Sequence, residues 1–159
     1  MSNIKTLKEL ISIREQLKKK NKKVVFTNGC FDIIHAGHVD YLCKAKELGN
    51  VLIVGLNTDD SVKCIKGDKR PIMKESERAI ILANLKPVDY VVLFNENTPI
   101  KLIEELVPDV LVKGADWDID DIIGKDIVIK SGGEVKNINY EVNQSTTDII
   151  KSILSRYKD

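Results

Sequence analysis

The chain has 159 residues, of which 43% are hydrophobic, and its 25 Lys and Arg nearly balance its 24 Asp and Glu to a net charge of +1. This length suits one domain around one core, so we expect residues 1–159 to form a single domain. The near-neutral charge gives no reason to expect a nucleic-acid or membrane partner.

The first elements alternate between helix and strand. Apolar residues at helical intervals predict an amphipathic leading helix over 4–20, within residues 1–22. The β-rich run 22–29 ends in Asn-Gly and predicts a strand that enters a tight turn. Residues 38–48 predict a helix capped by Gly49. The continuous apolar run 51–57 is typical of a strand buried on both faces.

The remaining two thirds of the chain continue this alternation. Thr98 and Pro99 suit the cap and the first turn of a helix. The further predicted elements are, in order, a helix at 75–85, a strand at 89–94, a helix at 98–106, a strand at 109–114, a helix at 119–131, a strand at 134–140 and a helix at 145–157. Together they predict an α/β fold, a Rossmann-like, doubly wound sheet of five parallel strands with helices on both faces. Ligands bind such sheets at the carboxyl ends of the strands, near the point where strand order reverses.

The cysteines and the hydropathy profile indicate the cellular compartment in which we expect the protein. Cys30, Cys43 and Cys64 are an odd number without a CxxC spacing, which argues against a disulfide framework and a structural zinc site. The N-terminus lacks the apolar stretch of a signal peptide, and no segment approaches the roughly 20 apolar residues that span a bilayer. We therefore expect a cytoplasmic protein with reduced thiols and no membrane partner.

Both histidines of the chain lie in one four-residue window, His35-Ala36-Gly37-His38, where the first strand leads into a helix. A helix N-terminus offers free N–H groups and a partial positive charge, and imidazoles donate hydrogen bonds to phosphate oxygens. This arrangement favours a polyphosphate site. A metal-binding pair and a purely structural pair are the alternatives. Dinucleotide binding is disfavoured because the loop lacks GxGxxG.

The segment VVFTNGCFDIIHAGHVDYL resembles the HxGH nucleotidyltransferase superfamily, the cytidylyltransferase-like group. The later segments IKGDKRPI, PDVLVKGADW and QSTTDII are similar to the adenylyltransferase domain of bacterial ADP-heptose synthases. In many bacteria that domain is fused to a heptose kinase, and the chain resembles the stand-alone version. The resemblance implies transfer of the adenylyl group of ATP to a sugar 1-phosphate, D-glycero-D-manno-heptose 1-phosphate above all, with release of pyrophosphate. It also implies a homodimer.

The resemblance and the spacing of residues together assign roles. Catalysis is assigned to His35, His38 and Lys44. Nucleotide binding is assigned to Thr27, Asn28, Gly29, Phe31, Gly37, Lys113, Gly114, Asp116, Ser145, Thr146 and Thr147. Substrate binding is assigned to Asp32, Asn57, Asp59, Lys66, Arg70, Arg78 and Trp117. Magnesium is expected to arrive with the triphosphate, and the sequence shows no dedicated protein ligands for it.

Several of these residues also have ordinary structural explanations. Lys44 is equally explained as a solvated surface residue, Asp32 as a group that orients its loop, and Asp59 and Ser145 as helix caps. Trp117 suits a packing role as well as stacking on a base.

The sequence departs from the proteins it resembles at Ala115, Trp117 and Gln144. These departures leave a second enzyme open, which uses CTP with glycerol 3-phosphate or another polyol phosphate. A nucleotide-binding module without catalysis is also open, although the intact histidine pair counts against it. An NAD-dependent redox protein is disfavoured by the missing glycine fingerprint.

Overall fold

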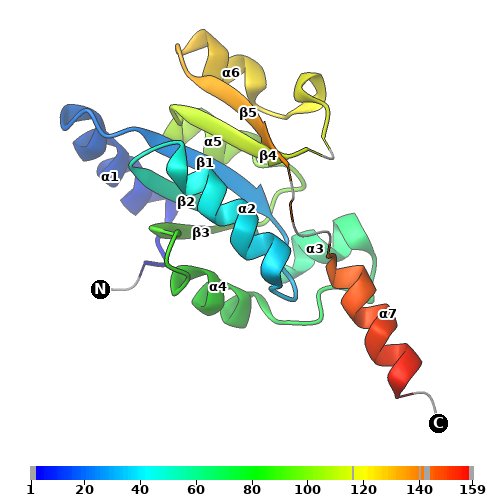
Figure 1. Ribbon diagram of the computed structural model, residues 1–159. Coiled ribbons are helices and arrows are strands. Elements are labelled where there is room, and N and C mark those ends of the chain that lie inside the picture. The colour runs from blue at the N-terminus through cyan, green and yellow to red at the C-terminus, as the bar shows by residue number, and fades with distance from the viewer. Residues whose placement is uncertain (1–2, 116, 140, 142–143, 158–159) are drawn as a thin grey trace.

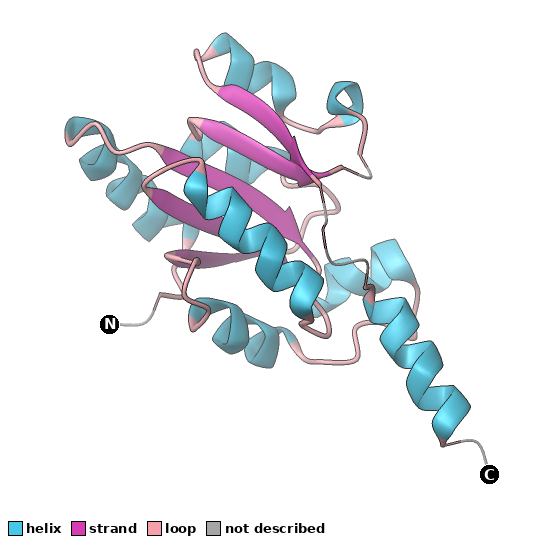
Figure 2. Ribbon diagram, in the orientation of Figure 1, coloured by secondary structure: helices cyan, strands magenta, loops and turns pink. Residues whose placement is uncertain are grey.

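The computed structural model of the protein describes residues 3–115, 117–139, 141 and 144–157. Its helices and strands alternate along the chain (Figures 1 and 2). In chain order they are α1 Leu7–Lys19, β1 Val24–Gly29, α2 Ala36–Glu47, β2 Val51–Asn57, α3 Asp59–Lys66, α4 Glu75–Ala83, β3 Tyr90–Phe94, α5 Ile100–Leu106, β4 Val110–Gly114, the 3-10 helix η1 Ile119–Asp121, α6 Lys125–Lys130, β5 Glu134–Ile138 and α7 Thr146–Arg156.

The five strands form one parallel sheet in the order β3-β2-β1-β4-β5. The chain moves outward from β1 to β3 and then returns to place β4 on the other side of β1. Strand order therefore reverses at β1, and this is where doubly wound sheets bind ligands. The predicted α/β fold with five parallel strands is confirmed.

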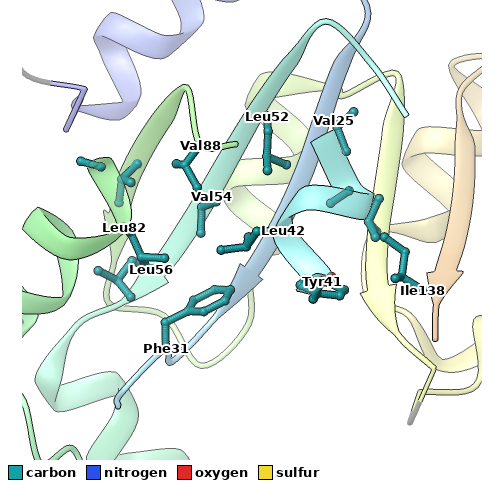
Figure 3. Packing of buried hydrophobic residues seen from close by; sticks show 14 of the residues in the cluster. Val25, Phe31, Tyr41, Leu42, Leu52, Val54, Leu56, Leu82, Val88 and Ile138 are labelled. Carbon is teal, nitrogen blue, oxygen red and sulfur yellow. The ribbon is translucent and has the colours of Figure 1, made fainter. Parts of the chain in front are cut away.

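Helices cover both faces of the sheet, as predicted (Figure 1). One face packs against α2 and α4, and Figure 3 shows Leu42 of α2 and Leu82 of α4 against Val54 of β2. The other face packs against α1, α5 and α6 through a second cluster of fully buried aliphatic and aromatic side chains. Successive residues of a strand point to opposite faces, so both faces of β1 and β2 are apolar in sequence.

Two predicted helices differ from the structure at their ends or in their number. The leading helix begins at Leu7 rather than at residue 4, because Thr6 and Glu9 form a capping box there. Ile4 instead makes an isolated parallel bridge to Val91. The helix predicted at 119–131 is two helices, since Gly124 between them has φ 87° and interrupts the helical backbone.

Helix α3 is an addition to the predicted elements, and two predicted caps are misplaced. Thr58 accepts a hydrogen bond from the Ser61 N–H at 3.4 Å and caps α3, as the capping alternative for this segment allows. Thr98 is the predicted N-cap of α5, but the N-cap is the next residue, Pro99, and the helix begins at Ile100. Gly49 is not the cap of α2, which is Leu48. A Cβ at Gly49 would lie 2.7 Å from Val25 Cγ2, so the glycine allows a close approach of α2 to β1.

Candidate active site

The candidate site lies where β1 ends and α2 begins. Thr27 is fully buried, and its hydroxyl is 2.7 Å from the Tyr41 hydroxyl of α2, which fixes strand and helix together. A Cβ at Gly29 would lie 3.0 Å from the Phe31 ring, so a larger residue would require this ring to shift. Phe31 itself has φ 42°, in the left-handed region, and its ring closes the end of the core (Figure 3). The chain thus turns sharply at this point and leads into the segment with the two histidines.

His35 and His38 stack on one another at the N-terminus of α2. Their ring centroids are 3.8 Å apart with 23° between the planes, and the Phe31 ring lies 5.2 Å from that of His38. His35 is the N-cap residue and Gly37 is buried in the first turn. The Nδ1 atoms of both rings are buried without a hydrogen-bond partner. The free N–H groups of this helix end and the two rings together form an anion-binding arrangement.

Burial keeps both imidazoles neutral. Desolvation lowers the pKa of His35, and desolvation together with the charge of His35 lowers the pKa of His38 to about 4. At neutral pH each ring therefore donates from one nitrogen only. A polyanion close to the rings favours their charged form and would raise both pKa values.

The N-terminus of α7 meets this segment. The Thr146 hydroxyl donates to the Ile33 carbonyl at 3.3 Å, two residues before His35. The Ser145 hydroxyl accepts from the Asp148 N–H at 3.1 Å and donates to its carboxylate at 2.6 Å, so the N-cap alternative for Ser145 is seen. Thr147 is exposed. Two helix N-termini, those of α2 and α7, are thus held next to one another by residues 113 positions apart in the chain.

The carboxyl ends of β4 and β5 border the site on its other side. Lys113 Nζ lies 3.4 Å from the Asn28 carbonyl and 5.4 Å from the centroid of the Trp117 ring. Gly114 is buried at the end of β4, and 46% of Trp117 is exposed. Asn137 of β5 donates to the Trp117 carbonyl at 2.6 Å and was missed by the sequence analysis. Trp117 is thus partly exposed beside Lys113, which leaves both stacking on a base and packing open.

Asp32 holds the loop before α4. Asp32 is 1% exposed. Its carboxylate accepts hydrogen bonds from the backbone N–H groups of Ile72 and Met73, each at 2.9 Å, and from Arg70 Nε at 2.6 Å. Burial alone would raise the pKa of Asp32, but these hydrogen-bond donors lower it overall. The carboxylate is thereby fully used within the protein, and Asp32 orients the loop, which was the alternative to substrate contact. Arg70 Nε is the donor of the hydrogen bond to Asp32 Oδ2.

Arg78 joins three segments beneath the site. It is fully buried, and its guanidinium donates to the Met73, Cys30 and Asn57 carbonyls at 3.0, 2.6 and 2.9 Å and to Asp59 Oδ1 at 2.7 Å. The structure therefore gives the fully buried Arg78 a positioning role, while Asp59 pairs with it through Oδ1 and keeps 30% of its side chain exposed. Asn57 is also buried, and its amide donates to Ser61 Oγ at 2.9 Å.

Lys44 lies apart from the histidines. It is six residues beyond His38 on α2, which corresponds to about 9 Å along the helix, and its ammonium pairs with Asp40 and Glu141. These partners hold the Lys44 ammonium on the side of α2, and the assignment of Lys44 to catalysis stays a prediction. Lys66 is exposed at the end of α3. Asp116 lies outside the described residues.

Two hollows of the described surface lie at the opposite end of the sheet, where the strands begin. One of about 500 Å³ is bordered by Val51 and Tyr90, and one of about 360 Å³ by Asp109 and Gly133, all at the starts of strands. Neither touches the histidines. We place the candidate site at the α2 N-terminus nonetheless, because a polyphosphate is bound by an open array of donors rather than an enclosed cavity.

Comparison with known proteins identifies the family of the chain. Residues 26–152 match the cytidylyltransferase-like proteins. The chain belongs to the cytidylyltransferase-like family. This confirms the resemblance seen in the sequence, and the candidate site is formed by segments within the matched range. Among the described residues, no helix of this family member is both long and apolar enough to cross a membrane.

Relatives of this cytidylyltransferase-like chain are similar over nearly its whole length. The bifunctional protein HldE of Citrifermentans bemidjiense is 53% identical over 156 residues, 98% of this chain and 32% of that protein. Bifunctional protein HldE of Helicobacter pylori is 51% identical over 150 residues, 94% of this chain and 32% of that protein. The chain thus spans about a third of the length of the curated relatives it matches.

Two solved structures share the fold. The lipopolysaccharide core biosynthesis protein from Thermoplasma volcanium GSS1 is 31% identical with a TM-score of 0.62, over 77% of this chain and 99% of that one. Pantoate-beta-alanine ligase from Francisella tularensis, solved with an ATP analogue and beta-alanine, is 19% identical with a TM-score of 0.61, over 98% of this chain and 80% of that one. The second likeness concerns the fold alone.

Proposed function

We propose that this protein transfers the adenylyl group of ATP to a sugar 1-phosphate, D-glycero-D-manno-heptose 1-phosphate above all, and so forms ADP-heptose and pyrophosphate. The observation that carries the proposal is the stacked pair His35 and His38 between the N-termini of α2 and α7. The similarity to the HldE proteins extends over nearly the whole chain, and it supports the choice of a sugar phosphate as acceptor.

In the proposed reaction a phosphate oxygen of the acceptor attacks the α-phosphorus of ATP in line with the leaving group. The new P–O bond forms as the bond from the α-phosphorus to the bridging oxygen breaks, and pyrophosphate leaves with that electron pair. The attacking phosphate is already anionic, so no general base is required. Burial raises the pKa of the Cys30 thiol, which disfavours a covalent route through this residue.

The residues of the site act by position and charge. The imidazoles of His35 and His38 and the free N–H groups of the two helix ends are placed to stabilise charge on the departing β- and γ-phosphates. Lys113 is placed to neutralise the α-phosphate, since its ammonium lies beside the end of β1. Trp117 offers a face on which the base can stack.

Magnesium belongs to the proposal as a companion of the triphosphate. The described residues contain no group of three or more His, Cys, Asp or Glu side chains that fits a metal ion. Within the part of the chain that the structure describes, we therefore assign no residue to a magnesium site. Because ATP is the proposed donor, we also propose that the reaction takes place in the cytoplasm and, from the resemblance, in a homodimer.

The test is pyrophosphate release by the purified protein with magnesium. ATP, CTP, GTP and UTP are each combined with heptose 1-phosphate, other sugar 1-phosphates and glycerol 3-phosphate, and a His35→Asn variant serves as the control for contaminating activity. Release from ATP with heptose 1-phosphate alone supports the proposal. Release from CTP with glycerol 3-phosphate favours the cytidylyltransferase alternative. Nucleotide binding without release from any pair favours a binding module.

A further inference from the structure

Helix α7 needs to be held in place if its N-terminus takes part in the site. Figure 1 shows α7 extending away from the sheet, and Ile153, Leu154 and Tyr157 on its later turns are exposed. Its first residue, Thr146, makes the hydrogen bond to Ile33. A helix of 11 residues is marginal in water without such tertiary contacts. The position of this N-terminus therefore depends on what fixes the segment that precedes it.

Three groups from Asp40, Lys44 and Glu141 connect that segment to α2. Lys44 Nζ donates to Glu141 Oε1 at 2.9 Å, to Asp40 Oδ2 at 3.0 Å and to the Asn139 carbonyl at 3.2 Å. The same Asp40 oxygen accepts from the Glu141 backbone N–H at 3.3 Å. Asn139 and Glu141, which follow β5 in the connection to α7, are thereby bonded to one turn of α2.

These groups are charged at neutral pH. The hydrogen bond from Lys44 to Glu141, followed by that to Asp40, raises the pKa of the Lys44 ammonium. The hydrogen bond from Lys44, followed by that from the Glu141 N–H, lowers the pKa of Asp40. All three side chains remain partly or largely exposed, with 26% of Lys44, 23% of Asp40 and 76% of Glu141 accessible. Each ion pair is therefore weak alone, and the three contacts act together.

We propose that Lys44 is a positioning residue, which clasps the β5–α7 connection to α2 through Asp40 and Glu141 and so sets the N-terminus of α7 against the histidine segment. The clasp joins α2 to the connection before residues 142–143, and the bond from Thr146 to Ile33 joins the start of α7 to the β1–α2 loop after them. When the clasp opens, only the bond from Thr146 to Ile33 holds the α7 N-terminus. The protein then populates more of a form in which only the N-terminus of α2, and not that of α7, lies at the candidate site.

Hydrogen exchange tests the clasp without reference to any reaction. In Lys44→Met, the first-turn amides of α7, including the Ile149 N–H that donates to Ser145 at 3.1 Å, should exchange about three- to tenfold faster, the factor that two partly exposed ion pairs supply. Amides of α2 should keep their wild-type rates. Unchanged exchange in α7 overturns the proposal.

Lys46→Met is the matched control. Lys46 lies on the same helix, is also partly buried, and also pairs with a carboxylate, that of Asp89 at the other edge of the sheet. Its loss removes a comparable ion pair without touching the connection to α7. Faster exchange of α7 in Lys46→Met, equal to that in Lys44→Met, would show a general loss of stability and would also overturn the proposal.

The kinetic half of the test rests on the proposed function. Lys44→Met should lower the fraction of protein whose α7 N-terminus is in place to bind nucleotide, and saturating nucleotide should restore that fraction. The KM for ATP should therefore rise about three- to tenfold, while kcat stays within about twofold. Loss of kcat by a factor of about 100 with unchanged exchange would instead make Lys44 catalytic. The conservative change Lys44→Arg, which keeps a cation between Asp40 and Glu141, should keep KM near wild type. If wild type releases no pyrophosphate, the proposed function fails and hydrogen exchange alone decides on the clasp.

Discussion

His35 and His38 stack with their ring centroids 3.8 Å apart while both Nδ1 atoms lack partners. Neutral rings tolerate this distance, but two imidazolium ions would repel one another strongly. Burial lowers the pKa of each ring, so the pair is neutral before a ligand enters. The site thus holds two donors that gain strength when a polyanion arrives.

Replacing either histidine should reduce transfer without unfolding the protein. We expect His35→Asn and His38→Asn each to lower kcat by about 10²–10³, the usual loss when one donor to a developing charge is removed. Steady-state pyrophosphate release measures the change, and the thermal midpoint by circular dichroism reports on folding. Activity within threefold of wild type in both variants would contradict a role in charge stabilisation.

His38 should make stability depend on pH. Its pKa is lowered from 6.5 to about 4 in the folded protein, so the unfolded chain binds this proton at higher pH. Stability should be full above about pH 6.5 and fall by up to about 3 kcal/mol as pH decreases towards 4. Urea unfolding between pH 4 and 7 measures the slope.

The control for this pH dependence is His38→Asn, which lacks the titrating ring. Its free energy of unfolding should change less over the same interval, although His35 retains a smaller effect of the same sign. Glu134, whose paired lysines lower its pKa to about 2, titrates below this interval in the folded protein. Equal slopes for variant and wild type would show that His38 is not buried neutral.

Arg78 should be the most costly charged residue to replace near the site. Arg78→Met leaves three backbone carbonyls without their donor and Asp59 without its cation. We expect a loss of about 3–5 kcal/mol in the free energy of unfolding. Arg156→Met, on the exposed part of α7, should change it by less than about 0.5 kcal/mol. Equal effects in urea unfolding would refute the positioning role of Arg78.

Trp117 should report nucleotide binding. It is the only tryptophan of the chain, and 46% of it is exposed. Stacking of a base on its ring should change its fluorescence intensity saturably with ATP, at concentrations that agree with calorimetric binding. Trp117→Phe should retain binding, because a phenyl ring also stacks, whereas Trp117→Ala should weaken it by about 1–3 kcal/mol by analogy with base–aromatic stacking. Calorimetric binding without any fluorescence change would place the base elsewhere.

The sequence predicts the sheet well because burial on both faces has a clear pattern. The apolar run Val51–Asn57 becomes a central strand, as expected. Helix α3 escapes prediction because its eight residues are mostly charged or polar, and only Val62 and Ser61 are buried. The single helix predicted over 119–131 is wrong because periodicity does not show that Gly124 adopts a left-handed backbone.

The site is predictable where it is local and less so where it depends on tertiary contacts. The histidine window can be found because four consecutive residues form it. The function of Asp32 as a clamp on Ile72 and Met73 depends on contacts about 40 residues away. The ion pair of Lys44 with Asp40 could be predicted from their i,i+4 spacing, whereas its pairing with Glu141 depends on a segment almost 100 residues away.

The central place of β1 has a consequence for synthesis of the chain. Val25 pairs with Val110, so one edge of β1 has no partner until 85 more residues have been made. At about 5–20 residues per second, this edge stays open for several seconds on the ribosome. An open strand edge can pair with another nascent chain, so the hazard of aggregation lies in this interval. Thr146 emerges later still, so its hydrogen bond to Ile33 cannot form before nearly all of the chain has been translated.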